Sequence, residues 1–177
     1  VNGAVLNPNN GFDGEEFYSF PQANQNIELA NQLDLTQFTI AMWVNITSFQ
    51  NSWALPIGKK NSNQFIGATN GGNWRMRFSD GSSHDLAAFA PSTNAWQYWA
   101  VSYDGNTVKF YLDSNLLGSV QASGKTFNLK HFGETYTNDG FDFVGGLDNI
   151  FIYDRPLSDN EILQIYNTGG SSTGLDN

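Results

Sequence analysis

Four aromatic residues lie in or beside polar segments rich in Gly, Asn and Ser, where a ring can be exposed to solvent. A saccharide has apolar C–H faces that stack on aromatic planes, and its hydroxyl groups bond with Asn, Gln, Asp and Arg side chains. These positions therefore predict contacts with a sugar. The candidates are Trp53, Trp74, Phe89 and Tyr136.

Two arginines alternate with apolar residues in the segment 74–78. If the apolar residues face a core, Arg75 and Arg77 project from one face of a strand, about 7 Å apart. Guanidinium groups bind carboxylate and sulfate through paired hydrogen bonds. The pair would then suit an acidic polysaccharide, such as a uronate or a sulfated galactan. The simpler alternative is ion pairing with a nearby carboxylate, from Asp80, Asp85 or Asp113.

Patterns typical of hydrolytic catalysis do not occur in the sequence. A retaining glycosidase needs two carboxylates about 5 Å apart, but the adjacent Glu15 and Glu16 would point to opposite faces of a strand. Neither a Glu-x-Asp-x-x-Glu pattern nor a Gly-x-Ser-x-Gly nucleophile motif is found. His84 and His131 are in polar contexts, and we expect both at the surface. The sequence therefore favours a protein that is not an enzyme.

The charge distribution separates the ends of the chain from its middle. The net charge of −9 argues against binding to nucleic acid or to an anionic membrane. Residues 59–130 hold seven of the eight Lys and Arg, whereas residues 13–34 and 134–176 hold five and eight acids. Because the termini of a domain are often close together, we expect a carboxylate-rich corner. The absence of cysteine excludes disulfides and thiolate zinc sites.

Short alternating segments separated by turn residues predict about ten to twelve strands. Ile150 to Tyr153 is apolar on both faces, so both faces should be covered. Ser158 and Glu161 form a capping box that should begin one short helix. The fold class is thus all-β, a two-sheet antiparallel sandwich with a C-terminal helix. Expected strands include 38–46, 74–78, 96–103, 108–112, 116–120, 141–144 and 150–153.

Three stretches carry a resemblance to a known family. Residues 38–44 resemble its early Phe-Thr-x-x-x-Trp-Val strand, residues 96–113 its central hairpin, and residues 146–162 its closing strand and helix. The chain resembles the concanavalin A-like jelly rolls of the laminin G-like and pentraxin type. The resemblance implies that several aromatic residues pack in the core: Trp43, Trp96, Trp99, Phe110, Phe151 and Tyr153.

Many members of this family hold a structural calcium ion near the chain ends, and the resemblance implies the same here. Calcium binds carboxylate, amide and carbonyl oxygens. Asp148 matches the acid of the family's Gly-x-Asp motif, and the acidic corner supplies further candidates. Alternatively, Asp148 caps a turn by accepting backbone N–H groups. The further candidates are Asp13, Glu16, Asp139 and Asp142.

This fold hosts binding modules, adhesion modules and enzymes, so the site has to decide the function. We expect a jelly-roll domain over residues 1–168 and a linker over residues 169–177. We also expect a non-catalytic carbohydrate-binding module of a secreted, multi-domain polysaccharide-degrading enzyme or adhesin, monomeric within a longer chain. The alternatives are a protein-interaction module without a sugar site, and a jelly-roll lyase or hydrolase.

Overall fold

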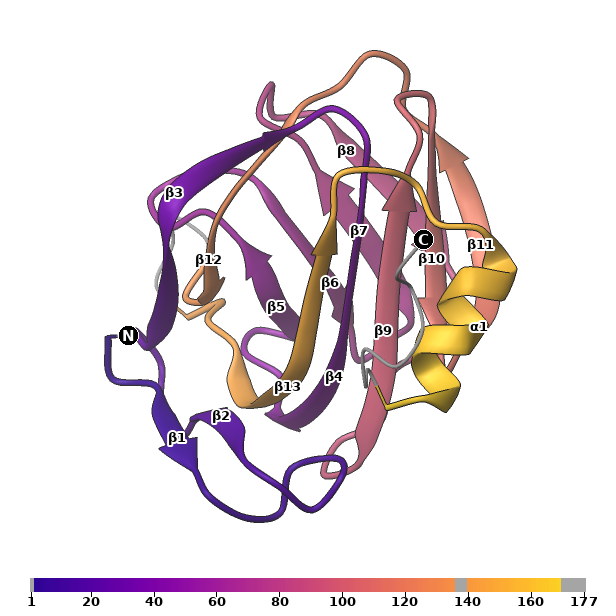
Figure 1. Cartoon of the computed structure of the whole chain (residues 1–177). Coiled ribbons are helices and arrows are strands. Elements are labelled where there is room, and N and C mark those ends of the chain that lie inside the picture. The colour runs from indigo at the N-terminus through magenta and orange to yellow at the C-terminus, as the bar shows by residue number, and fades with distance from the viewer. Residues whose placement is uncertain (1, 136–139, 170–177) are drawn as a thin grey trace.

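Two antiparallel sheets face each other in a sandwich, as the sequence predicts (Figure 1). The computed structural model describes residues 2–135 and 140–169, so only Gly169 of the predicted linker is described. The first sheet has seven strands in the order β1 (Val5–Asn7), β2 (Phe17–Phe20), β13 (Val144–Tyr153), β4 (Phe38–Ser48), β9 (Trp96–Tyr103), β10 (Thr107–Leu112) and β11 (Asn115–Gln121). The second sheet has six, in the order β3 (Asn26–Leu35), β12 (Phe127–Gly133), β5 (Trp53–Gly58), β6 (Phe65–Thr69), β7 (Asn73–Arg77) and β8 (Ser83–Ala87).

The main core lies between the two sheets and follows from the period-two alternation of the strands. On β4, Phe38, Ile40, Met42 and Val44 point inward, where they pack with aromatic residues of the facing sheet. The opposite face of β4 carries Trp43, which belongs to a second cluster. The core prediction is confirmed for the buried Trp43, Trp99 and Phe110. The other three aromatics are partly buried against the second cluster: Trp96, Phe151 and Tyr153.

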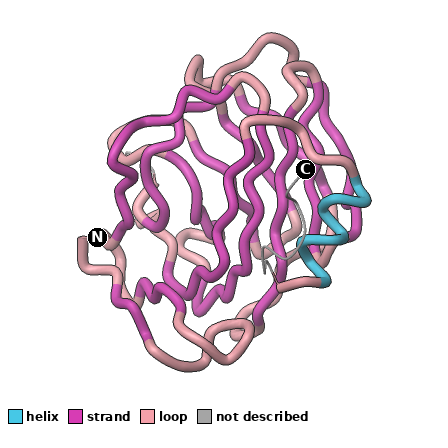
Figure 2. The backbone as a smooth tube through the Cα atoms, viewed as in Figure 1, coloured by secondary structure: helices cyan, strands magenta, loops and turns pink. Residues whose placement is uncertain are grey.

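One helix, α1 (Asp159–Asn167), covers part of the outer face of the seven-stranded sheet (Figures 1 and 2). It begins at the predicted capping box, in which Ser158 and Glu161 satisfy each other's backbone N–H groups. Ile162 and Ile165 are buried beneath it, whereas Leu163 is exposed. The helix therefore encloses the second cluster of apolar residues on the outer face of the seven-stranded sheet. No described helix is long and apolar enough to cross a membrane.

The closing strand differs from the prediction of two separate strands at 141–144 and 150–153. β13 is continuous and pairs with β4, with a β-bulge between Asp148 and Phe151. Asn149 takes up the extra residue at a φ of 45°, a left-handed conformation that Asn tolerates. The bulge keeps Ile150 and Ile152 on the main core and turns Phe151 and Tyr153 toward the helix. Both faces of this segment are covered, as predicted.

The hairpin of β10 and β11 turns through Asp113 and Ser114, whose φ angles are 48° and 63°. Two consecutive left-handed residues match the twist of a two-residue hairpin. Asp113 also accepts a hydrogen bond from the Tyr98 N–H at 2.9 Å, which ties the turn to β9. Ser114 therefore adopts the conformation that Gly would adopt more easily, and Asp113 is held in one orientation.

Candidate functional site

A pocket of about 210 Å³ lies on the outer face of the six-stranded sheet. Alternation along β7 turns Trp74 and Met76 toward the core and Arg75 and Arg77 outward, which confirms the predicted facing of the two arginines. The pocket also includes Trp53 of β5, so it unites three of the predicted site residues. Its remaining lining residues are Leu55, Phe65 and Phe141.

Two of the described residues, Asp85 and Trp53, contact the guanidinium of Arg75. Its Nε and Nη2 atoms donate to the two carboxylate oxygens of Asp85, each at 2.6 Å. Its guanidinium carbon lies 5.0 Å from the centroid of the Trp53 ring, within cation–π range. The hydrogen bonds from Arg75 lower the pKa of Asp85. The predicted alternative of ion pairing is thus confirmed for Arg75.

Arg77 differs from Arg75 in its partners. Its Nε donates to the backbone oxygen of Gly81 at 3.2 Å. Within residues 2–135 and 140–169, no carboxylate lies in ion-pair range of its guanidinium. Among the described residues, the positive charge that Arg77 presents to the pocket therefore has no carboxylate partner, although the protein as a whole carries −9.

Phe65 and Phe141 are pocket residues that the sequence did not reveal. Phe65 lies directly opposite Arg77 in the β6–β7 hairpin, but its low exposure of 4% makes it resemble an ordinary core residue. The turn at Asn70-Gly71-Gly72 fixes this register, and counting back from the turn would have placed Phe65 beside Arg77. No comparable signal marks Phe141, because it precedes β13 in an irregular segment.

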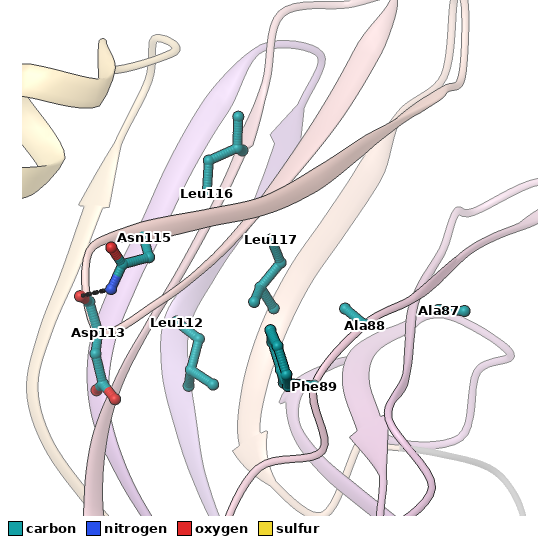
Figure 3. A pocket seen from close by; sticks show the side chains of 8 residues that line it. All are labelled: Ala87, Ala88, Phe89, Leu112, Asp113, Asn115, Leu116 and Leu117. Carbon is teal, nitrogen blue, oxygen red and sulfur yellow. Dashed lines mark hydrogen bonds between the residues drawn. The ribbon is translucent and has the colours of Figure 1, made fainter.

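Two of the predicted aromatic contacts do not join this pocket. The prediction for Trp74 is wrong: its side chain is fully buried, packs at a tilt against Trp99 with 4.5 Å between ring centroids, and donates Nε1–H to the Phe89 carbonyl at 2.8 Å. Its neighbouring Gly-rich turn suggested exposure, but the alternation of β7 decides otherwise. Phe89 is exposed and lines a different, larger pocket (Figure 3). Tyr136 lies outside the described residues.

A polar cluster lies near the C-terminal end of β12. Lys60 pairs with the buried Glu134 at 2.8 Å, and Glu134 also accepts from Asn26 Nδ2 at 3.0 Å. His131 is buried, contrary to the prediction of a surface histidine, and its Nδ1 accepts the Lys60 backbone N–H at 3.1 Å. Burial lowers the pKa of His131, which keeps the ring neutral. His84 is half-buried and its Nδ1 contacts the Gln121 carbonyl at 2.7 Å, so it too connects strands.

The four described carboxylates expected at a calcium site are not all at one place. Asp148 accepts the Phe12 and Asn149 backbone N–H groups at 2.8 and 2.7 Å, with Asp13 and Glu16 nearby. Asp142 instead accepts the Asn24 N–H at 3.0 Å. In the part of the chain that is described, no three His, Cys, Asp or Glu side chains form a group able to hold a metal. These contacts match the turn-capping alternative for Asp148. Asp139 lies outside the described residues.

The family model for the concanavalin A-like lectin/glucanases superfamily matches residues 21–163, which is most of the chain. The chain belongs to this superfamily. The jelly-roll resemblance seen in the sequence is thereby confirmed. A comparison with curated protein sequences found no match.

Solved structures with a similar fold come from proteins of different kinds. Domain 4 of the extracellular arabinanase AbnA from Geobacillus stearothermophilus, in complex with arabinotriose, is 18% identical with a TM-score of 0.73, over 94% of this chain and 82% of that one. A heptameric pentraxin from Limulus polyphemus is 14% identical with a TM-score of 0.68, over 89% and 82%. The receptor binding domain of botulinum neurotoxin D is 15% identical with a TM-score of 0.69, over 96% and 46%. At these identities the similarity shows the fold alone.

Proposed function

We propose that this domain is a non-catalytic carbohydrate-binding module that binds polysaccharide in the pocket of Trp53, Arg75 and Arg77. One observation carries the proposal: an aromatic ring from β5 and two guanidinium groups from β7 lie in one pocket. A sugar needs both an apolar surface for its C–H face and fixed donors for its oxygens.

Each pocket residue has a distinct role in this proposal. Trp53 is half-buried, so part of its ring is open to stack on a sugar. Arg75 holds that ring in place, because it is itself fixed by Asp85. Arg77 donates to the ligand. Because its charge has no carboxylate partner among the described residues, a carboxylate or sulfate group on the sugar would bind there more tightly than a hydroxyl group.

The chemistry of the pocket supports binding without catalysis. None of the described residues that line it is a carboxylic acid, whereas glycoside hydrolysis ordinarily uses two. The nearby Asp85 is bound to Arg75, and its lowered pKa keeps it ionised at neutral pH. It therefore cannot donate a proton as a general acid. A module of this kind would act by holding a partner domain on its substrate, and we place it in a secreted polysaccharide-degrading enzyme or adhesin, as a monomeric unit of a longer chain.

Affinity electrophoresis in gels that contain plant or marine algal polysaccharides tests the proposal. We expect retardation of the wild-type domain by at least one acidic polysaccharide, and loss of that retardation in Trp53→Ala and Arg77→Gln. Arg155→Gln is the matched control, because Arg155 is exposed and pairs with Glu161 beside the helix. If the wild-type domain migrates in every polysaccharide gel as it does in a gel without polysaccharide, the proposal is overturned.

A further inference from the structure

A second groove, of about 590 Å³, lies between the segment after β8 and the β10–β11 hairpin (Figure 3). It shares no lining residue with the pocket of Trp53 and Arg77. Its volume lies in the range of small-molecule sites. The groove therefore requires an explanation of its own.

The apolar part of the groove contains the most exposed aromatic ring among the large apolar residues of the described chain. Phe89 is 79% exposed and Leu116 is 46% exposed. The backbone beneath Phe89 is nevertheless fixed, because its carbonyl accepts from Trp74 Nε1 at 2.8 Å and the Ala88 N–H donates to Gly72 at 2.8 Å. A fixed backbone thus presents an aromatic ring to solvent, and a ligand that stacks on it need not order the chain.

The other end of the groove is polar. Figure 3 shows Asp113 and Asn115 there, with Leu112 and Leu117 between them and Phe89. Asp113 Oδ1 accepts from the Tyr98 N–H at 2.9 Å, and Asn115 Nδ2 donates to the Asp113 carbonyl at 3.0 Å. The remaining side-chain oxygens of these two residues have no partner in the described structure. They are acceptors in fixed positions, suited to hydroxyl donors.

We propose that this groove is a second saccharide site, selective for a neutral sugar. Phe89 stacks on the C–H face of a ring, while Asp113 and Asn115 accept hydrogen bonds from its hydroxyl groups. Asp113 is the one charged residue among those that line the groove, so the groove repels a carboxylate or sulfate. The groove therefore prefers neutral sugars, whereas the Arg77 pocket prefers acidic ones. The proposal stands on this groove alone and does not depend on the first pocket.

Amide chemical-shift mapping by NMR tests the proposal with arabinotriose, xylotetraose, cellotetraose and maltotetraose as probes, each at roughly 10 mM, enough for millimolar binding. We expect at least one probe to shift the amide signals of Phe89, Asn115 and Leu116. Phe89→Ala should weaken this binding about tenfold, while Phe89→Tyr, which keeps the ring, should bind within about threefold of wild type. Arg155→Gln, at an exposed ion pair beside the helix, should bind as the wild type does.

Three results would overturn the second site. The first is no shift of these amides with any of the four probes. The second is an affinity, from the titration of these shifts, that is unchanged in Phe89→Ala. The third is a shift of the same amides with protein concentration alone, which would make a second copy of the chain the occupant. If only the proposal for the first pocket fails, acidic polysaccharides will not retard the wild-type domain, but the neutral probes will still shift the amide signals of Phe89, Asn115 and Leu116.

Discussion

The guanidinium of Arg75 lies over the ring of Trp53, with 5.0 Å between its central carbon and the ring centroid. Asp85 fixes that guanidinium from the other side with two hydrogen bonds of 2.6 Å. An ion pair between neighbouring strands thus sets the position of an aromatic ring on a third strand. Of the two pocket arginines, Arg77 is the one with no carboxylate partner among the described residues.

Removing the carboxylate of Asp85 should change both the charge of the pocket and its rigidity. We expect Asp85→Asn to bind acidic polysaccharide several-fold more tightly at low salt, because Arg75 loses its counter-charge. The free energy of unfolding should fall by about 0.5 to 1 kcal/mol, as for a partly exposed ion pair. Calorimetric titration at two salt concentrations measures the first effect and urea unfolding the second. Asp80→Asn, which breaks the Lys125 ion pair instead, is the matched control; if it tightens binding equally, the effect is not local to the pocket.

Trp53 and Trp74 should respond oppositely to truncation. Trp74→Ala removes a fully buried ring and should cost about 3 to 5 kcal/mol of unfolding free energy. Trp53→Ala, at a half-buried surface position, should cost much less and should affect binding instead. Thermal unfolding of the two variants distinguishes the roles. A stable Trp74→Ala would contradict the assignment of this ring to the core.

Stability should fall in mildly acidic solution because of His131. Burial lowers the folded-state pKa of this residue below its ordinary value of 6.5, so the unfolded chain binds the proton first. Its contribution is therefore complete above about pH 6.5 and declines as the pH falls toward the folded-state pKa. Protonation at Nδ1 also removes the acceptor for the Lys60 N–H. Urea unfolding at a series of pH values should show a decline below pH 6.5 that is smaller in His131→Gln; an equal decline in both proteins would refute this origin.

Asp148 should stabilise the fold as a turn cap. Asp148→Asn replaces one of two acceptor oxygens with an NH2 donor, so one backbone N–H loses its acceptor, and the change should cost roughly 1 to 3 kcal/mol. The loss should be the same in calcium and in chelator. Melting temperatures under both conditions test this prediction: a calcium-dependent rise in the wild type that Asp148→Asn abolishes would contradict it and would support a calcium site at Asp148.

The sequence predicted the sandwich and its closing helix because both rest on local rules. Alternation placed Arg75 and Arg77 on one face, and the Ser158–Glu161 capping box placed the start of α1. The sequence did not predict that Asp142 and Asp148 bond to different loops, at Asn24 and Phe12, because charge counts along a chain do not specify which loops meet. Nor was Phe65 predicted as a pocket residue, because its place opposite Arg77 depends on the register that the turn at residues 70–72 sets between the two strands.

The polysaccharide site is tested most directly by calorimetric titration of the wild-type domain and of Trp53→Ala. The titrant is an acidic polysaccharide, such as polygalacturonate or a sulfated galactan. We predict saturable binding by the wild type that weakens with salt, and a loss of at least about tenfold in affinity in Trp53→Ala without loss of the folded state. Binding that is unchanged in Trp53→Ala, or no binding by the folded wild type, would contradict a polysaccharide site at Trp53, Arg75 and Arg77.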